Sequence, residues 1–295
     1  MNVTTRNRAG LQGAIPSVEP SWRAIVDNDF AGDPDGLVAL AHLLLSDSIR
    51  VDLVTTSALD AELVRVAGLE PDRTAARGSM LAGELASRCG RDDLPIVAGA
   101  ESFGTSDAEP SPAAAAIVEQ ARRDDPLPLV LLCGGPLTNV AAALRLEPDL
   151  ARRLVVVWVG GASDLGSAFE YNADTDRAAA DVVLASGLDV WRIPSGAYRR
   201  LRVSLAEVAG DLAAASPLGG WLAERLLDVP PFVTLRGSLV LGDSSLVSLI
   251  CLEPDLGPDP GRETPAPGER RPACGELDMR LLWGDLLARL RRAAT

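Results

Sequence analysis

Four aspartates near the start of the chain have the clearest chemical significance. They fall within nine positions, as Asp27, Asp29, Asp33 and Asp35. Carboxylates this close together repel one another unless a cation lies among them. A hard divalent ion such as Ca²⁺ accepts several carboxylate oxygens in a flexible geometry. The cluster therefore predicts a calcium site; the alternative interpretation is that Asp33 or Asp35 caps a helix while the other aspartates are solvated.

The acids need a strand before them and a helix after them. Residues 23–26 are predicted to form a short buried strand, and apolar residues from Leu37 to Leu45 recur at helical spacing. Residues 51–56 predict a second strand, which completes a β-α-β unit. The aspartates are then expected at the carboxyl edge of a parallel sheet, beside a helix N-terminus.

The same alternation of strand and helix continues along the chain. Further strands are predicted at 94–98, 127–133, 154–159 and 190–193, and helices at 113–123, 139–146, 177–186 and 278–291. This pattern predicts an α/β fold with a mostly parallel, doubly wound central sheet. We expect residues 1–22 to be a flexible lead-in and residues 23–295 to form a single domain. Within that domain, a loop rich in proline and glycine is expected at 257–275.

The composition argues against several classes of function. The 295 residues carry a formal net charge of −13, so no basic face is expected for nucleic acid. The chain has no lysine, which removes a P-loop and a Schiff base. Its four cysteines, Cys89, Cys133, Cys251 and Cys274, are scattered, which predicts reduced thiols. We find neither a membrane-spanning run nor a signal-sequence core, so a cytoplasmic protein without membrane contact is expected.

Several segments together resemble one known family in order and spacing. They are Asp27-Asn28-Asp29-Phe30-Ala31-Gly32-Asp33-Pro34-Asp35, Thr55-Thr56, Leu94-Pro95-Ile96-Val97-Ala98-Gly99-Ala100, Gly135-Pro136-Leu137-Thr138-Asn139, Glu170-Tyr171-Asn172 and Gly242-Asp243. From about residue 23 to residue 290 the chain resembles the calcium-dependent nucleoside hydrolases of the inosine-uridine preferring type, as a divergent member. The resemblance implies a Rossmann-like nucleoside hydrolase fold and hydrolysis of the N-glycosidic bond of a ribonucleoside, in purine or pyrimidine salvage. It also implies a homo-oligomer, either a dimer or a tetramer.

The resemblance divides the polar residues into metal ligands and sugar ligands. It implies that Asp29 binds Ca²⁺ and acts as the general base, and that Asp35, Asp243 and the backbone carbonyl of Gly134 complete the metal shell. The implied ribose ligands are Asp33, Glu170 and Asn172, together with Asp60 as a further substrate-binding residue. The aspartate loop is one residue longer than that of the family, so the separate roles of Asp33 and Asp35 stay open.

Some of these residues also have purely structural interpretations. Asn139 could cap a helix, Glu170 could be an exposed turn residue, and Asp243 could be an N-cap that also binds the ion. These alternatives predict different burial and different hydrogen-bond partners for the three side chains.

The group that activates the leaving base is not evident. Relatives carry His or Trp immediately before the late calcium-binding Asp, where this chain has Gly242. The only histidine, His42, lies within the first predicted helix and is expected to be structural. Trp221 is the candidate to stack on the base, with a role in the core as the alternative.

Two rival functions fit parts of the pattern. Asp27 and Asp29 after a strand could be the nucleophile and acid of a haloacid-dehalogenase-type phosphatase, but that mechanism normally uses a lysine. The second rival is a calcium- and ribose-binding protein that has the same fold and little or no turnover. The missing leaving-group acid motivates this second rival.

Overall fold

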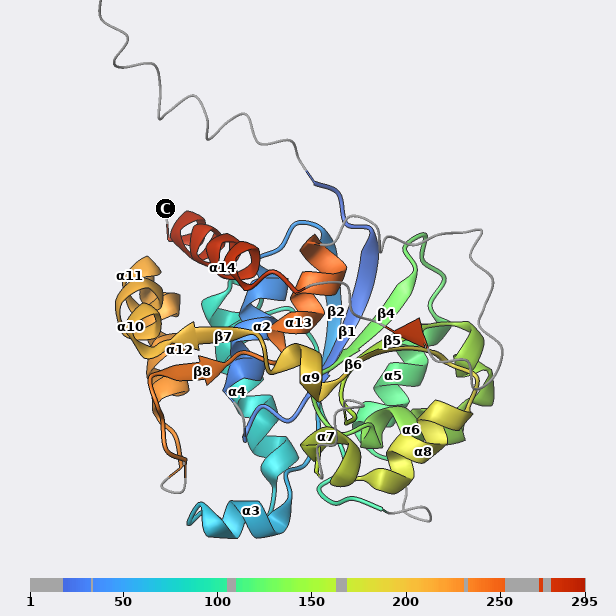
Figure 1. Cartoon of the computed structure of the whole chain (residues 1–295). Helices are drawn as coiled ribbons and strands as arrows, with labels where there is room; N and C mark the ends of the chain where they lie inside the picture. The colour runs from blue at the N-terminus through green and yellow to red at the C-terminus, as the bar shows by residue number, and fades with distance from the viewer. Residues whose placement is uncertain are drawn as a thin grey trace, which may run out of the picture.

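A parallel sheet forms the centre of the computed structural model (Figure 1). The structure describes residues 18–32, 34–104, 110–162, 169–230, 233–252, 271–272 and 277–294. Within these ranges the sheet has seven strands in the order β3-β2-β1-β4-β5-β6-β9, and every neighbouring pair is parallel. The strands are β1 (Trp22–Asn28), β2 (Ile49–Thr56), β3 (Ile96–Ala98), β4 (Leu129–Cys133), β5 (Val155–Val159), β6 (Asp189–Ile193) and β9 (Arg271–Pro272).

The direction of the strand order reverses at β1. Strand β1 pairs with β2 on one side and with β4 on the other. In an open parallel sheet, the loops that follow such a pair of strands diverge and leave a crevice at the carboxyl edge, where ligands bind. The loops after β1 and β4, which carry Asp29 and Gly134, are therefore placed at the ligand-binding point of the fold.

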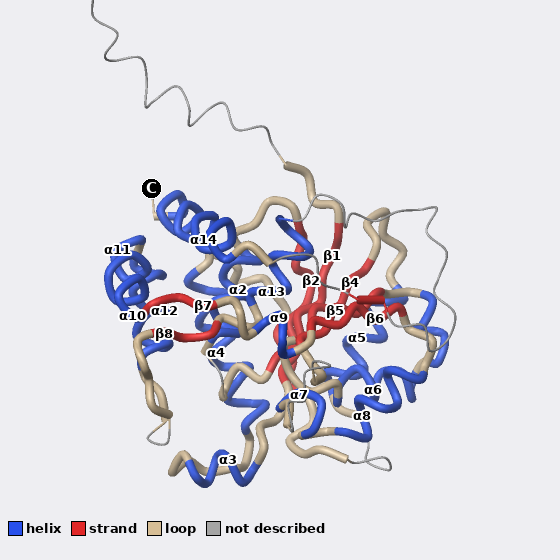
Figure 2. The backbone as a smooth tube through the Cα atoms, viewed as in Figure 1, coloured by secondary structure: helices blue, strands red, loops and turns tan. Residues whose placement is uncertain are grey.

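Helices cover both faces of the sheet (Figure 2). The core on one face includes residues of α2 (Asp35–Leu44), α4 (Thr74–Arg88), α12 (Pro217–Leu227), α13 (Ser244–Val247) and α14 (Met279–Ala293). The other face packs against α5 (Pro112–Arg122), α6 (Thr138–Leu146) and α8 (Arg177–Ala185). Successive residues of β1 point to opposite faces of the sheet: Ala24 and Val26 belong to the hydrophobic core on the first face, and Ile25 belongs to the core on the second.

Shorter elements complete the described structure. The short helices are α3 (Ala61–Val66), α7 (Tyr171–Asp174), α9 (Ser195–Tyr198), α10 (Leu205–Glu207) and α11 (Ala213–Ala215), with helical turns at Pro148–Arg152, Val208–Leu212 and Ser248–Leu252. A separate antiparallel pair consists of β7 (Arg202–Ser204) and β8 (Ser238–Val240). Helices α3 and α7 lie beyond the carboxyl ends of the central strands (Figure 1).

Side-chain caps fix where several helices begin. Ser111 accepts a hydrogen bond from the backbone of Ala114, and Pro112 occupies the first turn of α5. Asp176 caps α8 and also accepts a bond from Thr138 on α6, at 2.7 Å. The helices on the second face are therefore held to one another as well as to the sheet.

The predicted doubly wound α/β fold is confirmed. The six predicted strands and the predicted helices are present, and their ends shift by a few residues at most. The prediction missed β9, which adds to the sheet edge from within the segment 257–275; the rest of that segment, like residues 1–17, lies outside the described residues. Among the described helices, none is long and apolar enough to cross a membrane.

Candidate active site

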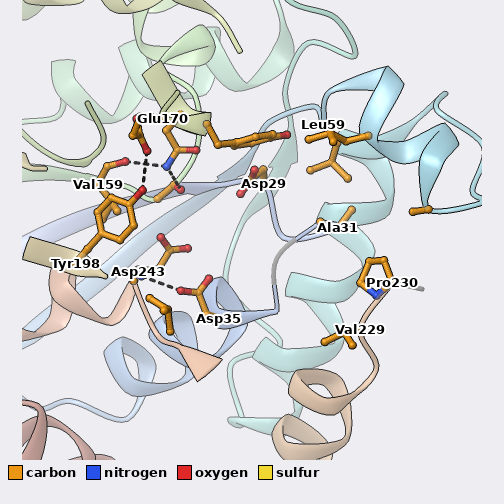
Figure 3. Close-up of a pocket in the computed structure, with 18 of the residues that line it drawn as sticks. Asp29, Ala31, Asp35, Leu59, Val159, Glu170, Tyr198, Val229, Pro230 and Asp243 are labelled. Carbon is orange, nitrogen blue, oxygen red and sulfur yellow. Dashed lines mark hydrogen bonds between the residues drawn. The ribbon is translucent and has the colours of Figure 1, made fainter. Parts of the chain in front are cut away.

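Four buried carboxylates line one pocket at the carboxyl edge of the sheet (Figure 3). Asp29 follows β1, Asp35 begins α2, Glu170 precedes α7 and Asp243 precedes α13. Each of the four is at most 5% exposed. The cavity has a volume of about 730 Å³, which lies within the range of roughly 300–1,000 Å³ found for small-molecule sites. The tertiary fold thus brings acids from four separate segments to one ligand-sized space.

Asn28 holds the aspartates in position. Its Nδ2 donates to Oδ2 of Asp243 at 2.8 Å, and its Oδ1 accepts from the backbone N–H of Asp29 at 2.8 Å. The backbone N–H of Asp243 donates in turn to Oδ2 of Asp35, at 3.0 Å. A Cβ at Gly134 would lie 2.7 Å from Oδ2 of Asp243, so only glycine fits there. A backbone carbonyl can come from any residue type, yet this position requires the smallest one.

Asn172 is fixed through both hydrogens of its amide. Nδ2 donates to the backbone carbonyls of Gly134 and Val159, each at 2.7 Å. An amide NH₂ has only two hydrogens, so Oδ1 is the atom of Asn172 left to meet a ligand. Asn172 can therefore accept a hydrogen bond from a hydroxyl in the pocket.

Glu170 is buried and bound through both oxygens. Oε2 accepts from the backbone N–H groups of Gly161 and Ala173, at 2.6 and 3.0 Å, while Oε1 accepts from the hydroxyl of Tyr198 at 2.9 Å. Burial and the neighbouring Glu170 carboxylate raise the pKa of Tyr198 well above its usual range. Tyr198 therefore stays a neutral donor, and Glu170 is an oriented acceptor rather than an exposed turn residue.

A fifth buried carboxyl, Asp27, lies at the end of β1. Its Oδ1 accepts from the Thr55 hydroxyl at 2.6 Å and from Nδ2 of Asn139 at 2.8 Å. Burial raises the pKa of Asp27, and these hydrogen bonds oppose that effect. Asn139 also donates to the carbonyl of Thr56, whereas the N-cap position of α6 is Leu137. Asn139 therefore ties β1 to β2 instead of capping its helix.

Asp60, one of the predicted sugar ligands, is not among the residues that line the pocket. The side chain of Asp60 caps α3 by accepting from the backbone of Glu62 and Leu63. Its own backbone N–H donates to the hydroxyl of Tyr171, a pocket residue, at 3.0 Å. Asp33 lies outside the described residues.

Trp221 and His42 also lie away from the pocket lining. Trp221 is 7% exposed and belongs to the core, with the guanidinium carbons of Arg88 and Arg225 each 5.1 Å from its ring centroid. His42 is 1% exposed, and its Nε2 contacts Oδ2 of Asp285 on α14 at 2.8 Å. Burial lowers the pKa of His42. The geometry gives Trp221 no contact with a base, and it assigns His42 a structural role.

Tyr198 is the main pocket residue that the sequence analysis missed. A Cβ at Gly242 would lie 3.0 Å from Cδ2 of Tyr198, so the phenol ring occupies the space beside that glycine. Tyr198 and Tyr171 each follow a predicted strand, β6 and β5, on the carboxyl side. The rule that located the aspartates, polar residues soon after parallel strands, could also have found Tyr198, which ends the short helix after β6; Tyr171 lies much farther from the end of β5.

The donor chemistry of the pocket suits a hard cation. Asp29, Asp35, Asp243 and the main chain of Gly134 supply oxygen atoms, the ligands that Ca²⁺ prefers. In the described part of the chain, no three His, Cys, Asp or Glu side chains are already gathered into a metal cluster. The donor atoms of these residues therefore fit calcium in their chemistry.

Comparisons with known proteins agree with this geometry. The family model described as inosine-uridine preferring nucleoside hydrolase matches residues 24–229. The pyrimidine-specific ribonucleoside hydrolase RihA of Citrobacter koseri is 27% identical over 226 residues, which are 67% of this chain and 69% of that protein. A purine-preferring ribonucleoside hydrolase from Gardnerella vaginalis has a TM-score of 0.68 at 18% identity, covering 92% of this chain and 99% of the other. The type III effector XopQ, complexed with adenosine diphosphate ribose, has a TM-score of 0.66 at 18% identity, with 97% of each chain covered. Since the family model spans most of the chain, this protein belongs to the inosine-uridine preferring nucleoside hydrolase family.

Proposed function

We propose that this protein hydrolyses the N-glycosidic bond of a ribonucleoside and that calcium is its cofactor. The supporting observation is the convergence of the buried carboxylates Asp29, Asp35, Glu170 and Asp243 on one pocket in a chain of this family. In the reaction the bond between C1′ and the base nitrogen breaks and the oxygen of water bonds to C1′. The leaving base takes up a proton, and free ribose is the second product. Positive charge develops on the sugar during this step, and nearby carboxylates stabilise it.

Asp29 is the proposed general base. Its backbone is held by Asn28, so its carboxylate projects from a fixed point at the end of β1. It would take the proton from the attacking water as the oxygen of that water bonds to C1′. Asp29 is therefore the residue whose side-chain charge matters most for turnover.

Asn172 and Glu170 are the proposed ligands of the sugar hydroxyls. Oδ1 of Asn172 and Oε1 of Glu170 are both acceptors, which suits hydroxyl donors of ribose. Asp33 is proposed as a further ribose ligand. Asp60 is proposed as a positioning residue, because its backbone N–H holds Tyr171 at the pocket.

Asp29, Asp35, Asp243 and the Gly134 carbonyl would hold the calcium ion. When bound, calcium would orient the sugar hydroxyls and favour loss of a proton from the attacking water. The hydrogen bond from Asn28 fixes the orientation of the Asp243 carboxylate that would bind the ion.

Release of reducing sugar tests the proposal. Purine and pyrimidine ribonucleosides and a nitrophenyl riboside are incubated with calcium or with a chelator. We expect release only with calcium, no release from Asp29→Asn, and weaker calcium binding by Asp243→Ala. Thermal denaturation checks that both variants are folded. Wild-type turnover by Asp29→Asn would contradict the assignment of the base.

A second candidate is a calcium-dependent ribosyl-binding protein without turnover. The observation in its favour is that neither His nor Trp is among the described residues lining the pocket, where Gly242 adjoins Tyr198. It predicts calcium-dependent binding of nucleosides with no sugar release from any of them, including the activated nitrophenyl riboside. The homo-oligomeric assembly implied by the family stays a prediction, which light scattering would test.

A further inference from the structure

One side of the pocket carries positive charge that hydrolysis of a bare nucleoside does not need. Arg199 and Arg202 line the same cavity as the four buried acids. Arg199 directly follows α9, and Arg202 is the first residue of β7. Both side chains are exposed, so a ligand entering from solvent can reach them.

Neither guanidinium is neutralised by the described part of the chain. Arg202 donates from Nε and Nη2 to the hydroxyl of Ser238, at 3.2 and 2.9 Å, and no salt bridge joins it or Arg199 to a described carboxylate. Many other arginines of this acidic protein have such a partner, as Arg50 has in Asp52. The exposed acid of the pocket, Asp228, lies beside Val229 in the chain, which Figure 3 places on the side of the pocket opposite Tyr198.

Arg199 lies on the Tyr198 side of the pocket, because it follows Tyr198 in the chain and hydrogen-bonds to its side chain. An N-riboside has three hydroxyls. The calcium-binding residues and the acceptors Asn172 and Glu170 would hold the hydroxyls that reach the buried acids. The 5′ oxygen has no hydrogen to donate once it carries a phosphate, so it would lie toward the exposed arginines. Tyr198 donates to Glu170, and Arg199 is the next residue in the chain. Figure 3 shows Tyr198 and Glu170 on one side of the pocket, and Val229 and Pro230 on the other. The apolar side would then receive the base.

We propose, on the basis of the proposed ribose site, that the preferred ligand is a ribosyl compound with a phosphate group on its 5′ oxygen. Arg199 and Arg202 bind that phosphate. Guanidinium groups match phosphate oxygens in geometry and form charge-assisted hydrogen bonds with them. The cavity of about 730 Å³ lies toward the upper end of the usual range for small-molecule sites, which accommodates this larger ligand. The class includes nucleoside 5′-monophosphates and 5′-diphosphate esters of ribose.

Calorimetric titration of matched ligand pairs tests the proposal. Uridine is compared with uridine 5′-monophosphate, and adenosine with its 5′-monophosphate and with adenosine diphosphate ribose, all with calcium present. Inorganic phosphate alone is the control ligand. The test variant is Arg199→Gln/Arg202→Gln, and Arg200→Gln is the matched control, because Arg200 is an exposed neighbour that does not line the pocket.

We expect each phosphorylated ligand to bind about tenfold or more tightly than its nucleoside, corresponding to about 1.4 kcal/mol. The double variant should lose this preference, Arg200→Gln should keep it, and added salt should weaken it. Whichever of the monophosphate and the diphosphate ligand binds more tightly shows whether the arginines fit one phosphate group or two. Equal affinity within each pair, equal loss in Arg200→Gln, or inorganic phosphate binding as tightly as the nucleotides would overturn the proposal.

The outcome separates this inference from the proposed function. If sugar is released from nucleosides and the protein shows no preference for a 5′-phosphate, the inference about phosphate is wrong and the proposed hydrolase activity is supported. If the protein prefers a 5′-phosphate through the two arginines but releases neither ribose nor ribose phosphate from any ligand, the inference is supported and the proposed hydrolase activity is wrong.

Discussion

The hydrogen bond between Asn28 and Asp243 gives a quantitative test of how the site is held. The two side chains are 1% and 5% exposed, and Nδ2 of Asn28 lies 2.8 Å from Oδ2 of Asp243. The substitution Asn28→Asp keeps the shape and replaces the donor by a second carboxylate oxygen. Oδ1 still accepts from the backbone of Asp29, so the change acts on the contact with Asp243 alone.

Two effects compete in this variant, and their sizes decide the result. If both carboxylates stay ionised, they repel by roughly 6 kcal/mol at an effective dielectric constant of about 20, and a charge-assisted bond worth about 1.5–3 kcal/mol is lost. Binding a proton instead costs about 1.4 kcal/mol for each pH unit above the ordinary carboxyl pKa of about 3.9. At about pH 7.5 that is about 5 kcal/mol, so protonation wins, and the new carboxyl donates to Asp243.

The destabilisation should therefore depend on pH. The introduced carboxyl has a folded pKa raised above its unfolded value, so the variant matches the wild type best below about pH 4 and loses stability as the pH rises. We expect a deficit in the free energy of unfolding of about 1–2 kcal/mol at about pH 5 and about 5 kcal/mol at about pH 7.5. Guanidinium unfolding with a chelator present measures both values.

Asn28→Ala is the matched control. It loses the hydrogen bond to Asp243 and leaves the buried N–H of Asp29 without that acceptor, which should cost about 2–5 kcal/mol of stability. Alanine introduces no titratable group, so position 28 itself adds no pH dependence to this cost. Calcium should restore more stability to Asn28→Asp than to Asn28→Ala, because a cation offsets the added charge. If the difference in the free energy of unfolding between Asn28→Asp and Asn28→Ala were the same at both pH values, the proposed contact between the two carboxyls would be refuted.

Three further substitutions test other parts of the site. Burial raises the pKa of Asp27, so the contribution of this carboxyl to stability is complete below about pH 4 and is lost as the pH rises through the folded pKa. Asp27→Asn should reduce this loss of stability with rising pH, which urea unfolding at a series of pH values from about 4 upward measures. Trp221→Leu should cost about 1–3 kcal/mol of stability through lost packing and lost contact with the flanking arginines, and leave KM unchanged for all bases; a base-dependent KM would place Trp221 at the ligand. Tyr198→Phe removes the donor to Glu170 and should raise KM about 3–10-fold with little change in melting temperature, and an unchanged KM would show that this bond does not orient the sugar ligand.

The fold was accessible from local patterns. Each strand of the central sheet except β9 is a compact apolar run, and each long helix between them has a regular apolar face. Parallel strands buried on both sides leave this signal because every residue of the strand needs apolar neighbours. Strand β9 has only two residues in a segment dense in proline, and such a short pairing depends on the neighbouring strand rather than on its own sequence.

The candidate site was only partly accessible from local patterns. Asp29, Asp35, Glu170, Asn172 and Asp243 were predicted from motif order, and the structure brings all five to one pocket. Asp29 directly follows β1, where chain polarity alone puts its side chain at the carboxyl edge of the sheet, whereas Asp243 follows β8 of the separate antiparallel pair and reaches the site only through packing. A residue in the position of Asp29 can be found without knowing which strands are neighbours, whereas the others were identified from the order of the motifs.

Trp221 and Asp60 show what local patterns could not decide. An aromatic residue looks the same in a sequence whether it faces a ligand or a core, and the packing of α12 turned Trp221 between two arginines. An aspartate before a helix can cap it or bind a sugar, and Asp60 caps α3. Side-chain direction depends on how an element packs, which involves residues distant in sequence.

The sequence by itself thus determined the order of strands and helices, the acids at their carboxyl ends and the family. Only the tertiary structure decided that Asn28 bridges Asp29 to Asp243, that Tyr198 orients Glu170, and that an arginine pair lines the same cavity as the buried acids. The physical reason is the separation in sequence over which each effect acts. Hydrophobic periodicity and chain polarity depend on a few neighbouring residues, whereas the contact between Asn28 and Asp243 joins positions 215 residues apart. Contacts of that kind exist only after the sheet and its helices have packed.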